Sequence, residues 1–239
     1  MEWTTWADRP IPNRQEEDYS AVPPPQECGE QLLDVTDRHP RIRFDATYAR
    51  RGFTQAWERC YLRSGLWERL VRAVESMPEE YSLLIFDGLR PLPLQKEIYD
   101  RCAQGFLERQ PDLTPQTLEA LMDDFVALPV KRPQRPAPHT TGGAVDLTLC
   151  RNGTPLDMGT GFDDFTSRAY TYWFEQPEQD ETVRKNRRIL YYLMESVGLL
   201  NYSAEWWHYA YGERMWARAV GCAPRYGFCE RCDFPPKTN

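Results

Sequence analysis

The chain has 239 residues, of which 41% are hydrophobic and 13% aromatic, so it can bury a sizeable core. Its formal net charge of -7 argues against a nucleic-acid-binding protein, which usually carries a basic footprint. No apolar run approaches the roughly 20 residues of a membrane helix, and the first 20 residues lack the apolar segment of a signal peptide. Seven scattered cysteines favour reduced thiols over a disulfide framework. We therefore expect a cytoplasmic protein without nucleic-acid or membrane partners; nothing in the sequence indicates a particular oligomeric state.

The two ends of the chain differ in composition. Residues 1–27 hold five prolines among polar residues, which predicts an extended N-terminal arm. Residues 28–239 are then expected to form one domain. Within it, residues 128–138 carry four prolines and three basic residues, which is typical of a connector on the surface.

Four segments have apolar residues at helical spacing, and three have the pattern of strands. The expected helices cover about 66–77, 94–106, 114–125 and 183–197; Pro78 ends the first and Gly198 the last. The expected strands are 82–86, which is apolar throughout, 144–149, which alternates as a half-buried strand does, and the aromatic segment 205–209. Helices and antiparallel-type strands mixed in this way predict an α+β fold.

Histidine is rare in the chain, and two of its three histidines stand near a carboxylate. Asp146 follows His139 by seven residues, and Glu205 precedes His208 by three, whereas His39 has no such context. A catalytic zinc needs three protein ligands and an open position for water, which two imidazoles and one carboxylate supply. The same residues are also compatible with ordinary hydrogen bonding, the neighbouring glycines with a turn, and the tryptophan pair with core packing.

Five segments together resemble the D-alanyl-D-alanine dipeptidase family, and they occur in that family's order. The segments are F-D-A-T-Y from Phe44, F-D-G-L-R-P from Phe86, H-T-T-G-G-A-V-D-L-T-L from His139, M-G-T-G-F-D from Met158 and S-A-E-W-W-H-Y from Ser203. The resemblance runs from about Cys28 to the end of the chain. It implies that residues 28–239 form a zinc dipeptidase domain, with a small antiparallel sheet that carries the metal site and is flanked by helices.

The resemblance also implies a role for individual residues. One Zn²⁺ per chain would be held by His139, Asp146 and His208, with Glu205 as the general base that activates the zinc-bound water. Arg90 would stabilise the developing oxyanion and orient the substrate. Tyr48 and Asp163 would receive the free amino end of a small dipeptide. The expected reaction is hydrolysis of D-alanyl-D-alanine to D-alanine, in cell-wall dipeptide metabolism or glycopeptide resistance.

Two features differ from the family pattern or require a particular geometry. The family usually has a serine able to contact substrate two residues before the first metal histidine, and this chain has Ala137 there. Glu205 and His208 are three residues apart, so an ideal strand would send them to opposite faces. If both side chains face one metal, the backbone between them must contain a turn or a bulge.

Three alternatives remain open at this point. Cys229 and Cys232, with Cys222, have a spacing compatible with a second metal, but a partner C-x-x-C is missing and inert thiols are the favoured interpretation. A zinc peptidase that acts on larger cell-wall peptides would need an open groove. A non-catalytic zinc module, such as the Hedgehog domain of this fold group, would need neither Glu205 nor Arg90.

Overall fold

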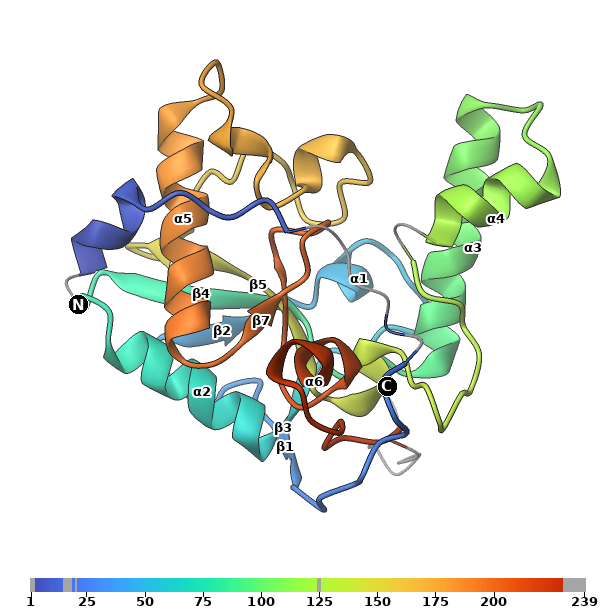
Figure 1. The fold of residues 1–239 in the computed structure, drawn as a ribbon, viewed down its shortest axis with the longest axis horizontal. Helices are drawn as coiled ribbons and strands as arrows, with labels where there is room; N and C mark the ends of the chain where they lie inside the picture. Colours follow the sequence, from blue (N-terminus) through green and yellow to red (C-terminus); the bar gives the residue numbers. More distant parts are fainter. Residues whose placement is uncertain (1–2, 15–18, 20, 124–125, 230–239) are drawn as a thin grey trace.

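The computed structural model describes residues 3–14, 19, 21–123 and 126–229, and Figure 1 shows their arrangement. Its centre is a mixed sheet in the order β2-β4-β5-β8-β7, with β6 paired to β5. The strands are β2 (Ile42–Phe44), β4 (Tyr81–Asp87), β5 (Ala144–Arg151), β6 (Thr154–Pro155), β7 (Leu200–Asn201) and β8 (His208–Ala210). Only β2 and β4 are parallel among these pairs. A separate antiparallel pair joins β1 (Leu32–Asp34) to β3 (Tyr61–Arg63). The predicted α+β class is confirmed.

All four predicted helices form, and two of them cover the sheet. They are α2 (Ser64–Glu75), α3 (Leu92–Arg109), α4 (Pro115–Asp123) and α5 (Glu181–Ser196). The helices α2 and α5 lie against the sheet, whereas α3 and α4 form a hairpin at its side (Figure 1). Residues 124 and 125, where the third helix was predicted to end, lie outside the described residues. In the described part of the chain, no helix has the length and apolar character needed to cross a membrane.

The helix ends follow the expected chemistry. Thr114 caps α4, because its hydroxyl oxygen accepts a hydrogen bond from the Thr117 N–H at 3.2 Å. Gly198, just beyond α5, has a φ of +81°, a left-handed conformation that glycine adopts without strain. The shorter helices were not predicted: α1 (Thr47–Arg50), α6 (Arg214–Val220), and the 3-10 helices η1 (Trp3–Asp8), η2 (Pro138–Thr141), η3 (Ser167–Ala169) and η4 (Trp173–Glu175).

The strand β5 is more deeply buried than its alternating sequence predicts. Every residue from Ala144 to Cys150 is buried, including the polar Asp146 and Thr148. The apolar positions join the core, and Asp146 is covered by side chains from neighbouring segments, as described below. The prediction of a half-buried strand was therefore wrong, because both faces of β5 are covered.

The N-terminal segment packs on the domain. Residues Trp3–Asp8 form η1, so the prediction of an extended arm is wrong for this stretch. Trp6 is 7% exposed and belongs to the hydrophobic core. The backbone oxygens of Ala7 and Pro10 accept hydrogen bonds from the side chains of Arg188 and Tyr192 on α5. Burial of an apolar side chain and these bonds hold the segment against α5, while the boundary at residue 28 stays a prediction.

Candidate active site

Two carboxylates and one imidazole lie in a single row of paired residues across the central sheet. Asp146 on β5 pairs in register with His208 on β8, and on its other side with Asp87 at the end of β4. Residues paired across antiparallel strands project their side chains to the same face, about 5 Å apart. The sheet itself therefore brings Asp87, Asp146 and His208 together.

The fourth member of this group, His139, comes from the short helix η2. The chain leaves η2 through Gly142, which has a φ of +72°, and then enters β5. This left-handed turn lets a histidine seven residues before Asp146 lie beside it. His139 Nδ1 lies 2.8 Å from the Gly88 carbonyl oxygen. A hydrogen bond donated there fixes the ring and leaves Nε2 free to bind a metal.

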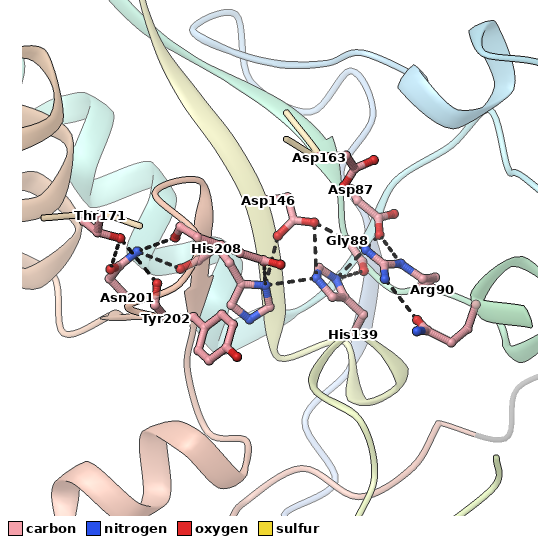
Figure 2. Close-up of polar contacts among 12 residues, drawn as sticks. Asp87, Gly88, Arg90, His139, Asp146, Asp163, Thr171, Asn201, Tyr202 and His208 are labelled. Atoms are coloured by element: carbon pink, nitrogen blue, oxygen red, sulfur yellow. Dashed lines mark hydrogen bonds and ion pairs between the residues drawn. The ribbon is translucent and has the colours of Figure 1, made fainter. Parts of the chain in front are cut away.

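The side chains of His139, Asp146 and His208 are buried and could hold a metal ion, since their ligand atoms all lie within 4.8 Å of one another. Asp146 Oδ2 lies 3.3 Å from His139 Nε2, and Asp146 Oδ1 lies 3.0 Å from His208 Nδ1. The two imidazole nitrogens are 3.2 Å apart. Figure 2 shows Asp146 between the two rings. In the part of the chain that the structure describes, this is the one such group.

Glu205 precedes β8 in a tight turn. The Glu205 N–H donates to Tyr202 O at 3.1 Å, and the His208 N–H donates to Glu205 O at 3.3 Å. The strand predicted over 205–209 is thus only partly correct, because β8 begins at His208. The turn resolves the spacing problem, since Glu205 Oε2 lies 3.8 Å from His208 Nδ1. The side chains of Glu205 and His208 therefore face the same site.

The side chain of Asn201, on β7, holds this turn in place. Its Nδ2 donates hydrogen bonds to Glu205 O at 3.0 Å and to His208 O at 3.1 Å. Its Oδ1 accepts one from the Thr171 hydroxyl at 2.7 Å. Figure 2 shows this group beside the turn. The backbone on both sides of the Trp206–Trp207 pair is therefore tied to a neighbouring strand.

Arg90 is held in a buried position beside Asp146. Its Nε donates to Asp87 Oδ2 at 2.7 Å and its Nη1 to Gln95 Oε1 at 2.9 Å. Its Nη2 lies 3.4 Å from Asp146 Oδ2 and 3.3 Å from the Tyr48 hydroxyl oxygen. Burial opposes the charge of the guanidinium, but the charges of Tyr48, Asp87 and Asp146 outweigh it and raise the pKa of Arg90. Arg90 therefore stays cationic.

Asp163, which lies next to Tyr48 and Arg51, has a strained backbone conformation. Its φ is +61°, which is unusual for a residue other than glycine and often marks a functional site. Its Oδ1 lies 3.3 Å from the Tyr48 hydroxyl, and its Oδ2 lies 2.9 Å from Arg51 Nη1. Burial, reinforced by the charge of Asp146 and opposed by Arg90 and Arg51, raises the pKa of Asp163 to about 7.

One cavity of about 320 Å³ joins these residues. All seven residues predicted from the sequence line it: Tyr48, Arg90, His139, Asp146, Asp163, Glu205 and His208. The volume is at the low end for small-molecule sites. His39 is not among the lining residues, and its Nδ1 instead accepts a hydrogen bond from the Arg41 N–H.

Two buried carboxylates in the cavity have pKa values shifted in opposite directions. Burial, then the charges of Asp146 and Asp163, raise the pKa of Glu205 well above its ordinary range. Burial also opposes ionisation of Asp146, but the two neighbouring histidines outweigh it and hold its pKa well below the ordinary range. The surroundings of Asp146 therefore favour its ionised form, whereas those of Glu205 favour a bound proton.

Comparison with known proteins agrees with this geometry. The family model described as D-Ala-D-Ala dipeptidase, Peptidase_M15, matches residues 29–225. The chain belongs to the D-Ala-D-Ala dipeptidase family.

Several members of the D-Ala-D-Ala dipeptidase family are similar to this chain. The D-alanyl-D-alanine dipeptidase of Synechocystis sp. is 30% identical over 219 residues, which cover 83% of this chain and 88% of the relative. The enzyme of the same name from Escherichia coli is 28% identical over 188 residues, covering 75% and 83%. That of Enterococcus faecium is 31% identical over 147 residues, covering 60% and 69%.

Sequence reasoning missed the residues that support the site of this dipeptidase-family chain. Asp87 and Gln95 hold Arg90, Asn201 holds the Glu205 turn, and Arg51 holds Asp163. Asp87 could have been identified from the sequence, because it lies inside the F-D-G-L-R-P segment. The other three lie outside the five segments that carried the resemblance.

The C-terminal cysteines show no metal group among the described residues. Cys222 is exposed and Cys229 half-buried, and both are free thiols. Cys232 lies outside the described residues, so the alternative of a second metal at these cysteines is not tested.

Proposed function

We propose that the protein is a zinc-dependent dipeptidase that hydrolyses D-alanyl-D-alanine to two molecules of D-alanine. The observation that carries this proposal is the shared cavity. All seven residues that are expected to bind metal, catalyse the reaction or hold the substrate line one cavity of about 320 Å³. The family name and the names of the similar proteins support the choice of substrate.

The donor set fits zinc. Two imidazole nitrogens and one carboxylate are ligands that Zn²⁺ binds in catalytic sites, where three protein ligands leave one position open. When bound, zinc supplies a Lewis acid that polarises the peptide carbonyl and acidifies water. The Gly88 carbonyl, which lies 2.8 Å from His139 Nδ1, supports Nε2 as the ligand atom of that residue.

Glu205 moves the proton in this mechanism. It takes a proton from the attacking water, whose oxygen forms a bond to the peptide carbon, and passes that proton to the leaving amine as the C–N bond breaks. Burial raises the pKa of Glu205, which makes its ionised form a stronger proton acceptor. Arg90, fixed by Asp87 and Gln95, places positive charge beside the developing oxyanion.

The amino end of the substrate binds at Asp163 and Tyr48. A free dipeptide carries an ammonium group, and the carboxylate of Asp163 lies in the cavity wall with the Tyr48 hydroxyl beside it. Burying a charge without a partner is costly, so this pocket selects a free amine. Peptides extended at the amino end would bring no ammonium to Asp163, and their added group would have to fit against this buried carboxylate.

Release of free D-alanine by the purified zinc-loaded protein tests the proposal. D-Ala-D-Ala should be hydrolysed much faster than L-Ala-L-Ala or a cell-wall pentapeptide. Faster cleavage of the pentapeptide would favour the larger-peptide enzyme, and binding of zinc without any hydrolysis would favour the non-catalytic module.

We also place the reaction in the cytoplasm. The six cysteines in the described part of the chain are free thiols, which supports a reducing compartment.

A further inference from the structure

Two arginines line the cavity, and a free dipeptide has two charged ends. Among the cavity-lining residues, Arg90 and Arg214 are the ones with a permanently cationic side chain. The acidic end of a free dipeptide needs such a partner, because an unpaired carboxylate in a pocket is costly to bury. The two arginines differ in how far their donors are already used.

Arg90 has little capacity left for a substrate carboxylate. Each of its three nitrogens donates to a protein acceptor: Nε to Asp87, Nη1 to Gln95, and Nη2 to both Tyr48 and Asp146. Recognition of a carboxylate by arginine typically uses two parallel N–H donors. Arg90 also lies on the same part of the wall as Asp163, since the Tyr48 hydroxyl is 3.3 Å from each of them. It is therefore badly placed to bind the end opposite the amine.

Arg214, the first residue of α6, has the free capacity that Arg90 lacks. Its Nη2 donates to the backbone oxygen of Tyr19 at 2.6 Å, and Tyr19 also lines the cavity. Nη2 is the one nitrogen of this side chain that donates to a protein acceptor among the described residues, and Nε is buried without a partner there. A buried donor without a partner is uncommon in a folded protein and calls for an explanation.

The neighbouring acid does not neutralise Arg214. Glu213 is 1% exposed, and both of its oxygens accept backbone N–H groups of α6, from Met215 at 2.9 Å and Trp216 at 2.8 Å. Burial, together with the positive charge of Arg135, lowers the pKa of Arg214, and the charge of Glu213 opposes this only in part. This part of the wall therefore favours an incoming negative charge.

We propose that Arg214 binds the α-carboxylate of the substrate, so that the enzyme requires a free carboxyl end as well as a free amino end. The inference rests on the proposed dipeptidase function and names the feature that limits substrates at their carboxyl side. Asp163 and Tyr48 bind one end and Arg214 the other, while Arg90 serves the reacting carbonyl. Dipeptides with a C-terminal amide are then poor substrates.

Comparing D-Ala-D-Ala with D-alanyl-D-alaninamide tests this inference. The wild-type protein should prefer the free acid by roughly 10- to 100-fold in kcat/KM, the range expected when a hydrogen bond to a charged group is lost. Arg214→Gln keeps a polar side chain but removes the charge. It should lower kcat/KM for the acid by a similar factor and leave the amide nearly unchanged, so the preference disappears.

Arg218→Ala is the matched control, because it removes an exposed arginine from the same helix and should keep the full preference. A preference for the acid that survives in Arg214→Gln would overturn the inference, as would an equal loss on both substrates, which indicates a structural role. Absence of any hydrolysis of D-Ala-D-Ala by the zinc-loaded wild type would instead refute the proposed function.

Discussion

Arg51 Nη1 lies 2.9 Å from Asp163 Oδ2, an ion pair between residues 112 positions apart in the chain. Arg51 also donates to the backbone oxygen of Phe162 at 3.0 Å. It therefore holds both the carboxylate of Asp163 and the backbone just before it, which has to lead into a left-handed conformation. The cavity-lining residues include Asp163 but not Arg51, so Arg51 supports the carboxylate without lining the cavity.

This ion pair predicts a pH dependence for the free dipeptide. In the proposed binding mode the substrate ammonium pairs with the ionised form of Asp163, whose pKa is raised to about 7. We therefore expect kcat/KM to rise as the pH passes through about 7, and to fall again when the dipeptide amine loses its proton near pH 8. Arg51→Gln removes a charge that holds the pKa of Asp163 down, so the rising limb should move up by about one pH unit.

Arg51→Lys keeps the positive charge, so the rising limb of the pH profile should stay close to its wild-type position. The pH profiles of kcat/KM for the three proteins decide the matter. A limb that stays in place in Arg51→Gln would mean that Asp163 does not control binding of the amine.

Asn201 predicts a separate effect on catalysis. Asn201→Leu removes the donors that hold Glu205 O and His208 O, so the base and one metal ligand lose their fixed geometry. A misplacement of about 1 Å can cost roughly 10²-fold in rate. We expect kcat to fall by that order while KM changes little. Thr171→Val, which removes only the hydroxyl that holds Asn201, should cost less; wild-type kcat in Asn201→Leu would contradict the proposed positioning role.

The metal ligands give a prediction in zinc content. His139→Ala, Asp146→Ala and His208→Ala should each lose most of the metal after dialysis against a chelator, because each removes one of three protein ligands. His39→Ala is the control and should retain one zinc per chain, since His39 lies outside the cavity. Full zinc occupancy in His208→Ala would show that the metal site is assigned wrongly.

Glu205→Gln should separate catalysis from metal binding. The variant keeps the size of the side chain but cannot accept the proton from water, so activity should fall by roughly 10²- to 10⁴-fold. Zinc content should remain at the wild-type level. Activity within a few-fold of wild type would contradict the role of Glu205 as base, and loss of zinc would identify it as a ligand.

Local patterns in the sequence predicted the longer helices. The helices α2, α3, α4 and α5 follow from apolar spacing and capping residues. The family resemblance identified the seven predicted site residues, all of which line the cavity, because each of them lies within a short contiguous segment. The turn at Glu205 was also anticipated, since two side chains three residues apart cannot share one face of a strand.

Long-range packing explains what the sequence did not predict. The pairing of Arg51 with Asp163 depends on how α1 and the 158–163 segment meet, which no local pattern encodes. The burial of Thr148 depends on what covers the second face of β5. The helix η1 was missed because the prolines that follow it dominate the composition, while Trp6 is buried against the core.

The ratio of kcat/KM for D-Ala-D-Ala to that for N-acetyl-D-Ala-D-Ala tests the central claim most directly. Acetylation removes the ammonium that Asp163 is proposed to bind and places an uncharged acetyl group against this buried carboxylate, so the wild-type ratio should be on the order of 10⁴. Asp163→Ala should shrink the ratio, chiefly by slowing the free dipeptide. Equal rates on the two substrates with the wild-type protein would contradict a closed dipeptide site and favour an enzyme that acts on larger peptides.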